Sequence, residues 1–548
     1  MPSLSPLSYL SLSGLGLKRP ERPRTLKPVE LEAQMLQKDR RVLEVRHLFP
    51  LPTGEEEVTY SYDLYLFFPR SFGVTPESWA REDFYRAATL QMRLNSPYLG
   101  LHELADLAHP MNPAGVLRKQ IAELLEPDVP SPRSMAALAQ MLGAELADKV
   151  SEQAARLRQE AGRLRSPQAL EQFEARLHLF CDDILLALGT LKRLRAKALA
   201  YAPVAPPALL TALGFAEEFA SAIVDERLAQ LAVYLEQCPA LHDGTGRALR
   251  LRLRLGHTVE MVNHRRLDQG YAIPDISEHD GEWFTYRKAN LKRELQRILY
   301  VDTRSVSRDP FYRNSAAAVG AGLAATWATI AQFQLFQQGL ANPNSLLLLG
   351  AAVGAYVLKD RIKEWSRNVL SGWLIRWDHD QELSSETLEQ IGMGGFSGRA
   401  RERMGFLGQT QLPPEIHAIR SACHTMKDLR LEEEQVVHYH RQLTLEPRSG
   451  MAVPEGFGIR EFFRLSLDGL LKALDEPRDK MAFYDSLRGR FREVTLPRVY
   501  HINAVLRTTE AETGRQLLQG VRVVVDRKRI KRVETVVEQQ EQLKTAGA

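Results

Sequence analysis

Two histidines placed two residues apart are the clearest metal-ligand types in the chain. His438 and His440 lie in a run rich in Val, Tyr and Leu, which predicts a strand that puts both side chains on one face. His424 lies upstream, next to Cys423. Zinc sites combine such residues, but they need three or four ligands. No carboxylate or cysteine pair at ligand spacing completes the set, so we favour a half-exposed strand face and assign no metal.

A glycine- and arginine-rich segment is the second candidate. Gly392, Gly394, Gly395 and Gly398 lie close together, and Arg399, Arg401 and Arg403 follow. Backbone N–H groups of glycines can approach a phosphate, and arginines can pair with it. However, the segment is neither a P-loop nor a dinucleotide fingerprint, because no strand clearly precedes it and no GK[ST] follows. We therefore favour a flexible linker, and assign no cofactor-binding residue.

A basic cluster lies near the C-terminus. Its members are Arg522, Arg527, Lys528, Arg529, Lys531 and Arg532. Such a cluster could contact anionic lipid headgroups or RNA. No nucleic-acid signature accompanies it, which makes nucleic acid unlikely. We favour a solvated strand face or a guarded sheet edge, with lipid contact as the alternative.

Other catalytic patterns are weak or missing in the sequence. Asp182 and Asp183 are adjacent on a predicted helix and point in different directions, which suits no carboxylate pair. No serine lies in a GxSxG motif. The three cysteines, Cys181, Cys238 and Cys423, are far apart and form no CxxC pair. The sequence thus assigns no catalytic residue and favours a protein that is not an enzyme.

The overall composition is that of folded soluble domains. Of 548 residues, 44% are hydrophobic and 26% are charged, which is unlike a polytopic membrane protein or a disordered chain. A net charge of +4 is too small to imply a nucleic-acid partner by itself. The length predicts two or three domains.

One uncharged run departs from this composition. Residues 314–358 contain no Asp, Glu, Lys, Arg or His, and Asn342-Pro343-Asn344 is a turn signal within the run. We predict a transmembrane helical hairpin with arms at about 315–340 and 345–358. The second arm has only about 21 Å of helix, short of a hydrocarbon core of about 30 Å. The alternative is a buried hairpin in a soluble helical bundle.

Basic flanks predict the orientation of this hairpin. Arginines precede the run, lysines and arginines follow it, and the turn is uncharged. By the positive-inside rule we therefore predict a protein of the cell membrane (inner or plasma) with both termini in the cytoplasm. These flanking residues are Arg304, Arg308, Arg313, Lys359, Arg361, Lys363 and Arg367. Small residues recur every four positions, which permits close packing of the two arms or of a second copy. The rows are Ala317, Ala321 and Ala325; Gly320, Ala324 and Ala328; and Gly350 and Gly354.

A further amphipathic helix is predicted at 359–377, directly after the hairpin. It carries Trp365, Trp373 and Trp377, which with Trp327 are four of the six tryptophans of the chain. Tryptophan favours the headgroup layer, so this helix either runs along the membrane surface or packs on a soluble core.

The remaining segments predict an α+β protein. We expect a flexible tail at 1–40, then a mainly helical domain at 41–313 that starts with a β-hairpin formed by 41–49 and 57–68. Long helices are expected between 131 and 201 with a break at Ser166-Pro167, and further helices at 207–235, 246–268 and 286–300. A linker at 378–430 leads to an antiparallel β domain at 431–533, with strands at 434–445, 459–467, 494–507 and 517–533, a short helix at 468–474, and a tail at 534–548.

Three classes of function remain open. The first, which we favour, is a membrane-tethered scaffold or regulatory protein that binds protein partners at the cytoplasmic membrane surface. The second is an enzyme that acts on a phosphorylated or lipid-linked substrate through the segment 392–403. The third is a homo-oligomeric membrane assembly built through the small-residue rows. The lipid bilayer is the expected partner in all three.

Overall fold

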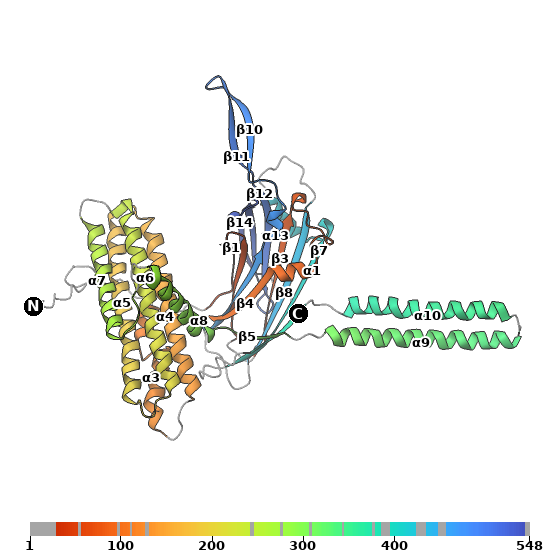
Figure 1. Ribbon diagram of the computed structural model, residues 1–548, viewed down its shortest axis with the longest axis horizontal. Helices are drawn as coiled ribbons and strands as arrows, with labels where there is room; N and C mark the ends of the chain where they lie inside the picture. Colours follow the sequence, from red (N-terminus) through yellow and green to blue (C-terminus); the bar gives the residue numbers. More distant parts are fainter. Residues whose placement is uncertain are drawn as a thin grey trace, which may run out of the picture.

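The computed structural model describes residues 29–542, except 53–55, 96–98, 110–111, 127–130, 242–245, 274–277, 306–308, 342–344, 375–378, 385–394, 424–433 and 448–455. A helical bundle and a β domain lie side by side, and two hairpins project from the β domain (Figure 1). One is the long helical hairpin α9–α10 and the other is the β-hairpin β10–β11.

The helices are α1 Arg81–Ala87, α2 Leu101–Ala105, α3 Pro113–Ala122, α4 Pro132–Ala161, α5 Pro167–Ala200, α6 Pro207–Glu236, α7 Arg247–Asp268, α8 Glu278–Arg297, α9 Asp309–Ala341, α10 Ser345–Leu374, α12 Pro414–Ala422 and α13 Asp468–Lys472. The strands are β1 Glu32–Asp39, β2 Val42–Pro50, β3 Val58–Phe68, β4 Ala88–Asn95, β5 Asp302–Ser305, β6 His379–Ser384, β7 Phe396–Leu407, β8 Gln435–Pro447, β9 Gly458–Ser466, β10 Arg478–Asp485, β11 Arg490–Pro497, β12 Tyr500–Glu510, β13 Arg515–Val525 and β14 Ile530–Gln542.

Helices α2 to α8 form the bundle. Proline stands at the start of α4, α5 and α6, where its missing N–H costs nothing. Ser166 caps α5 by accepting a hydrogen bond from the Ala169 N–H at 3.2 Å. Helices α4 and α6 approach closely at Gly143, where a Cβ would lie 2.6 Å from the Cβ of Ala216. The predicted helix break at Ser166-Pro167 is confirmed, and α8 begins earlier than predicted.

Among the described residues, one helix, α6, has the length and apolar composition of a membrane-crossing helix. Within its most apolar window 67% of the residues are buried in the bundle, as expected for the core helix of a soluble domain. By this criterion the predicted transmembrane hairpin is not confirmed as a membrane span, although both of its helices form.

Two antiparallel sheets pack face to face in the β domain. The larger has eight strands in the order β14-β13-β12-β3-β8-β7-β6-β5, and the smaller has four in the order β1-β2-β9-β4. Strand β3 shows why they pack. Tyr62 and Leu64 face the smaller sheet in the main core, whereas Tyr65 and Phe67 lie on the outer face, in a second apolar cluster with Ile416 of α12.

The predicted β-hairpin of 41–49 and 57–68 is wrong in its pairing. Both runs are strands, but β2 pairs with β1 and β9, while β3 pairs with β8 and β12. The two strands meet face to face instead, since the His47 and Tyr62 rings stack at 4.1 Å. Both runs are rich in buried residues on their two faces, so their best partners come from distant parts of the chain.

Several predicted segments near the ends also need correction. Strand β1 lies within the predicted flexible tail 1–40, and the rest of that tail up to residue 28 lies outside the described residues. The predicted strand 494–507 is divided between β11 and β12, and 517–533 between β13 and β14. Strand β14 continues to Gln542 because it pairs with β13 along that length, so most of the predicted tail 534–548 is strand.

The helical hairpin is inserted between the last two strands at one edge of the larger sheet. β5 precedes α9, β6 follows α10, and these strands pair with each other, with Asp302 opposite Ser384. The arms lie antiparallel and project away from both domains (Figure 1). Helix α10 runs without interruption from Ser345 to Leu374, so 359–374 is not the separate surface helix that the sequence predicts. The predicted linker 378–430 contains β6, β7 and α12 among its described residues.

Candidate functional site

A cluster of one carboxylate, two histidines and one arginine lies on the outer face of the larger sheet. Asp63 on β3 is directly opposite His440 on β8 and Arg507 on β12. Asp63 Oδ1 lies 2.8 Å from His438 Nε2 and 2.8 Å from His440 Nδ1. Asp63 Oδ2 accepts hydrogen bonds from Arg507 Nε at 3.0 Å and Nη2 at 2.8 Å. We call these four residues the outer cluster.

Neighbouring groups fix the side chains of the outer cluster. The His438 ring stacks on Tyr65, with 4.6 Å between centroids. Arg507 Nη1 donates a hydrogen bond of 2.7 Å to Glu415 Oε1 in the first turn of α12. Helix α12 is held on the sheet by Ile416 and Ile419, which pack in the second apolar cluster described above. The outer cluster is therefore built on central strands and supported from one side by a helix.

The electrostatics of the outer cluster favour an ionised carboxylate. Burial raises the pKa of Asp63, but hydrogen bonds from His438 and His440 and the charge of Arg507 outweigh burial and hold this pKa well below its usual range. The Asp63 side chain is 9% exposed, while His438 and His440 are 23% and 26% exposed. The cluster is thus charged, ordered and open to solvent on its histidine side.

Sequence reasoning found the histidines and missed the carboxylate. His438 and His440 share a face of a strand, as predicted, but the third donor comes from residue 63. The atoms of Asp63, His438 and His440 that could bind a metal ion all lie within 4.8 Å of one another. The only signal in the sequence was a single acid in the apolar and aromatic run of β3. His424 lies outside the described residues, and Cys423 is buried beside Gly520, away from the histidines.

A second charged network lies on the inner face of β8, between the two sheets. Arg441 Nε donates to Glu461 Oε2 on β9 at 2.9 Å, and Nη1 donates to Glu402 Oε2 on β7 at 3.4 Å. The Tyr439 hydroxyl also donates to Glu402. Arg441 and Glu461 are fully buried, so we read this inner network as part of the core.

His47 lies beside the inner network. Its Nε2 is 3.2 Å from Thr508 Oγ1, and its ring is buried. Burial, together with the nearby charge of Arg441, lowers the pKa of His47 to about 3. The imidazole is therefore neutral at ordinary pH.

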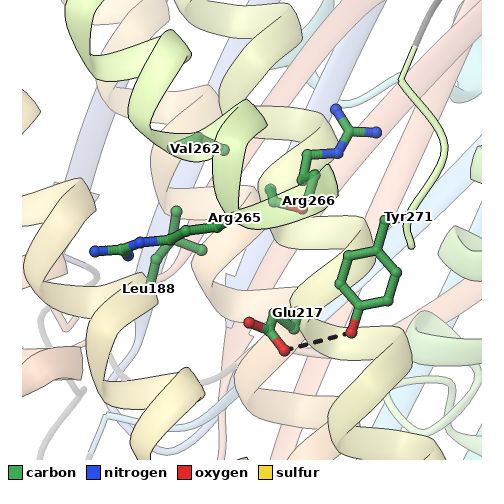
Figure 2. A pocket seen from close by; sticks show the side chains of 7 residues that line it. Leu188, Glu217, Val262, Arg265, Arg266 and Tyr271 are labelled. Atoms are coloured by element: carbon green, nitrogen blue, oxygen red, sulfur yellow. Dashed lines mark hydrogen bonds between the residues drawn. The ribbon is translucent and has the colours of Figure 1, made fainter. Parts of the chain in front are cut away.

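The helical bundle contains a small polar cavity (Figure 2). Tyr271 donates a hydrogen bond of 3.3 Å to Glu217 Oε2, which also accepts one of 2.8 Å from Arg195 Nη1. In Figure 2, Glu217 and Tyr271 face each other while Arg265 points away. The volume of about 10 Å³ holds about one water molecule. The cavity is thus too small for a substrate, and its polar groups serve the packing of α5, α6 and α7.

The glycine- and arginine-rich segment does not form the predicted loop throughout. Gly392 and Gly394 lie outside the described residues, whereas Gly398, Arg399, Arg401 and Arg403 lie on β7, which pairs with β6 and β8. A Cβ on Gly398 would lie 2.8 Å from the Thr444 carbonyl oxygen. This glycine therefore serves close packing of two strands.

The predicted basic cluster is partly neutralised by neighbouring acids. Arg522 pairs with Glu534 at 3.2 Å and donates to the Cys423 carbonyl oxygen at 2.6 Å. Lys531 pairs with Asp526 at 3.4 Å. Arg527 pairs with Glu476, and Arg532 with Glu534. Lys528 and Arg529 are exposed at the β13–β14 turn, where they line a polar cleft at the base of β10–β11.

The adjacent Asp182 and Asp183 do point in different directions. Asp182 is paired with Arg254 of α7, whereas Asp183 is buried.

Comparisons with known proteins give no match to a family model, to a curated sequence or to a solved structure.

Proposed function

We propose that this chain is a membrane-tethered scaffold or regulatory protein. Its α9–α10 hairpin inserts into a lipid bilayer, and its bundle and β domain bind partners on one side, the cytoplasmic side. The anchor, and not any catalytic arrangement, is the feature on which this proposal rests.

The supporting observation is the apolar surface of the projecting hairpin. Large side chains near its tip are exposed, among them Phe333 at 63%, Phe336 at 68% and Leu349 at 65%. Between Trp327 and Lys359 this surface also includes Ile330, Val353, Tyr356, Val357 and Leu358. A soluble protein rarely exposes so much contiguous apolar surface without a partner, and hydrocarbon would cover it from all sides.

The base of the hairpin favours entry from one side. Because β5 and β6 are paired neighbours in one sheet, the chain leaves and re-enters the β domain at the same edge. Basic residues follow the apolar part of α10, as the positive-inside rule expects for a cytoplasmic base.

The charges on α10 limit the depth of insertion. Counted in residues, Lys359 is as far from the start of α10 as Trp327 is from the end of α9. Because the two helices are antiparallel, both residues lie at the same distance from the tip of the hairpin. Beyond that level toward the tip, α10 has about 21 Å of uncharged helix, against about 30 Å for a hydrocarbon core. We therefore propose that the distal half of the hairpin enters the bilayer, with Trp327 and Lys359 at the headgroups. A full two-pass span then needs local thinning.

The β10–β11 hairpin supports the partner-binding part of the proposal. It projects away from both domains and from the direction of α9–α10 (Figure 1). Leu487 at its tip is 98% exposed and Phe491 is 82% exposed. This two-stranded sheet pairs with no further strand among the described residues, so it offers open edges and apolar side chains to a protein partner.

Flotation of the full-length protein with phospholipid vesicles tests the anchor. The variant Phe333→Glu/Val353→Glu should no longer float, because each charge costs about 2.5–3.5 kcal/mol at the centre of a membrane helix. Both side chains are exposed, so the fold should be retained. Leu253→Glu on α7, also at an exposed position, is the matched control and should float like the wild type. Equal flotation of all three proteins would overturn the anchor.

Depth-dependent quenching tests the proposed level of insertion. Single fluorophores on cysteines introduced at Phe336 and at Arg361 should respond oppositely to brominated acyl chains, with strong quenching at 336 and little at 361. Strong quenching at both positions would show that the charged part of α10 also enters the hydrocarbon, contrary to the proposed depth.

Self-assembly is the second candidate function, and one observation favours it. The row of Gly320, Ala324 and Ala328 is largely covered within the hairpin, but Gly350 and Gly354 have no atoms within 4 Å of an added Cβ. They leave a small-residue surface that a second hairpin could approach. Gly350→Leu/Gly354→Leu should then reduce the oligomer size in detergent, and an unchanged size would exclude assembly through this row.

A further inference from the structure

We propose that Asp63, His438 and His440 form a binding site for a divalent transition-metal ion of the zinc class. The inference is independent of the membrane anchor, because the site lies on the outer face of the larger sheet.

The donor atoms are already gathered at nearly the required spacing. Asp63 Oδ1 lies 2.8 Å from a nitrogen of each histidine. A zinc ion bonds to such donors at about 2.0–2.1 Å in tetrahedral geometry, so each histidine-to-carboxylate distance would lengthen by about half an ångström. The two histidine nitrogens already lie within 4.8 Å of each other. To bind the ion, each imidazole presents the lone pair of the nitrogen that now faces Asp63 and carries its proton on the other ring nitrogen.

The surroundings orient these ligands. Arg507 holds Asp63 Oδ2 through two hydrogen bonds, which directs Oδ1 toward the histidines. Tyr65 stacks on the ring of His438. Such outer contacts fix ligand orientation in metal sites, and all three ligands stand on neighbouring strands of one sheet.

The site is open on the β7 side. Residue 405, directly opposite His438 on β7, is glycine, and a Cβ added there would have nothing within 4 Å. Both histidines are partly exposed. The ion can therefore enter from solvent and keep a water molecule in its fourth position, as in zinc sites with three protein ligands.

The donor set and the local charge select the class of metal. Two imidazoles and one carboxylate suit zinc and similar ions, whereas calcium and magnesium prefer oxygen donors. Arg507 is a cation near the site, but Glu415 pairs with it at 2.7 Å. Arg403, opposite His440 and exposed, is a second cation on this face, so we expect weaker binding than at four-ligand structural zinc sites.

Calorimetric titration with zinc chloride tests the site. The full-length protein is used in detergent, without an affinity tag and after treatment with a chelator. The wild type should bind one zinc ion per chain, and cobalt should give the visible absorption of a nitrogen- and oxygen-ligated site. His438→Ala/His440→Ala should abolish this binding, and the nearly isosteric Asp63→Asn should weaken it at least about tenfold.

His417→Ala is the matched control, because His417 is an exposed histidine on the neighbouring helix α12. It should bind zinc like the wild type. Hydrogen exchange of β8 amides shows whether each variant keeps its fold. If His438→Ala/His440→Ala does not, the single variants Asp63→Asn and His440→Gln are tested in its place. Absence of zinc binding by the wild type, or wild-type binding by folded ligand variants, would overturn the proposal.

Discussion

Strand β8 carries a charged cluster on each of its faces, and the two clusters differ in their contact with water. On the outer face, His438 and His440 meet Asp63 and are partly exposed. On the inner face, Arg441 meets Glu402 and Glu461 between two sheets. The residue types are similar, but the outer groups can exchange partners with solvent or an ion, whereas the inner groups pair with other buried side chains and lie away from water. Burial therefore separates a binding site from a structural network.

The largest effect that tests this comparison is expected on the inner face. Arg441→Met leaves the carboxylates of Glu402 and Glu461 buried without their cation, which should cost about 3–5 kcal/mol. Hydrogen exchange of β8 and β9 amides measures this loss within the β domain. Arg403→Met, at an exposed position of β7, is the control and should cost less than about 0.5 kcal/mol. Equal losses for both variants would contradict the distinction between the faces.

Acidification should also act first on the inner face. The pKa of His47 is about 3 in the folded protein and about 6.5 in the unfolded chain. The unfolded state therefore binds the proton more readily, and stability present above pH 6.5 is lost as the pH falls toward 3. Between pH 7.5 and pH 5 the loss should be about 2 kcal/mol.

The pH effect is measured by hydrogen exchange of β2 and β3 amides at a series of pH values. His47→Gln should flatten the profile in this window, while the exposed His417→Gln should leave it unchanged. The prediction fails if the wild-type and His47→Gln profiles are parallel.

A smaller effect is expected on the outer face. Asp63→Asn removes the charge that joins Arg507 to both histidines, and should cost about 1–2 kcal/mol, because the cluster is partly solvated. The lowered pKa of Asp63 means that its stabilising contribution is present above the ordinary pKa of a carboxyl and is lost only as the pH falls below about 4. The difference between wild-type and Asp63→Asn in the exchange of β3 and β12 amides should therefore shrink below pH 4 and stay constant near pH 6.

The smallest effect is expected from Arg507→Lys. Lysine keeps the charge but loses the planar fork that holds Asp63 Oδ2, which should cost about 0.5–1 kcal/mol. Exchange of β12 amides measures it, with Arg515→Lys at the start of β13 as control. A loss as large as that of Arg441→Met would show that the outer cluster is also a core element.

The candidate site was only half predictable from the sequence. Two histidines at a spacing of two on a strand are a local pattern, and β8 forms where that pattern indicated it. Asp63 is not local, because it reaches the histidines through the pairing of β3 with β8. The same limit explains the wrong hairpin of β2 and β3, since local alternation identifies strands but does not select their partners.

The sequence by itself determined the long helices of the bundle, the strands β8 and β9, and the uncharged run that becomes α9 and the start of α10. These features follow from periodicity, caps and composition over short distances. Only the tertiary structure decided that β3, from the N-terminal part of the chain, shares one sheet with β12, β13 and β14, that α10 continues without interruption through its charged half, and that Asp63 joins His438 and His440. Each depends on which surfaces exclude water together, and that is a property of the folded chain.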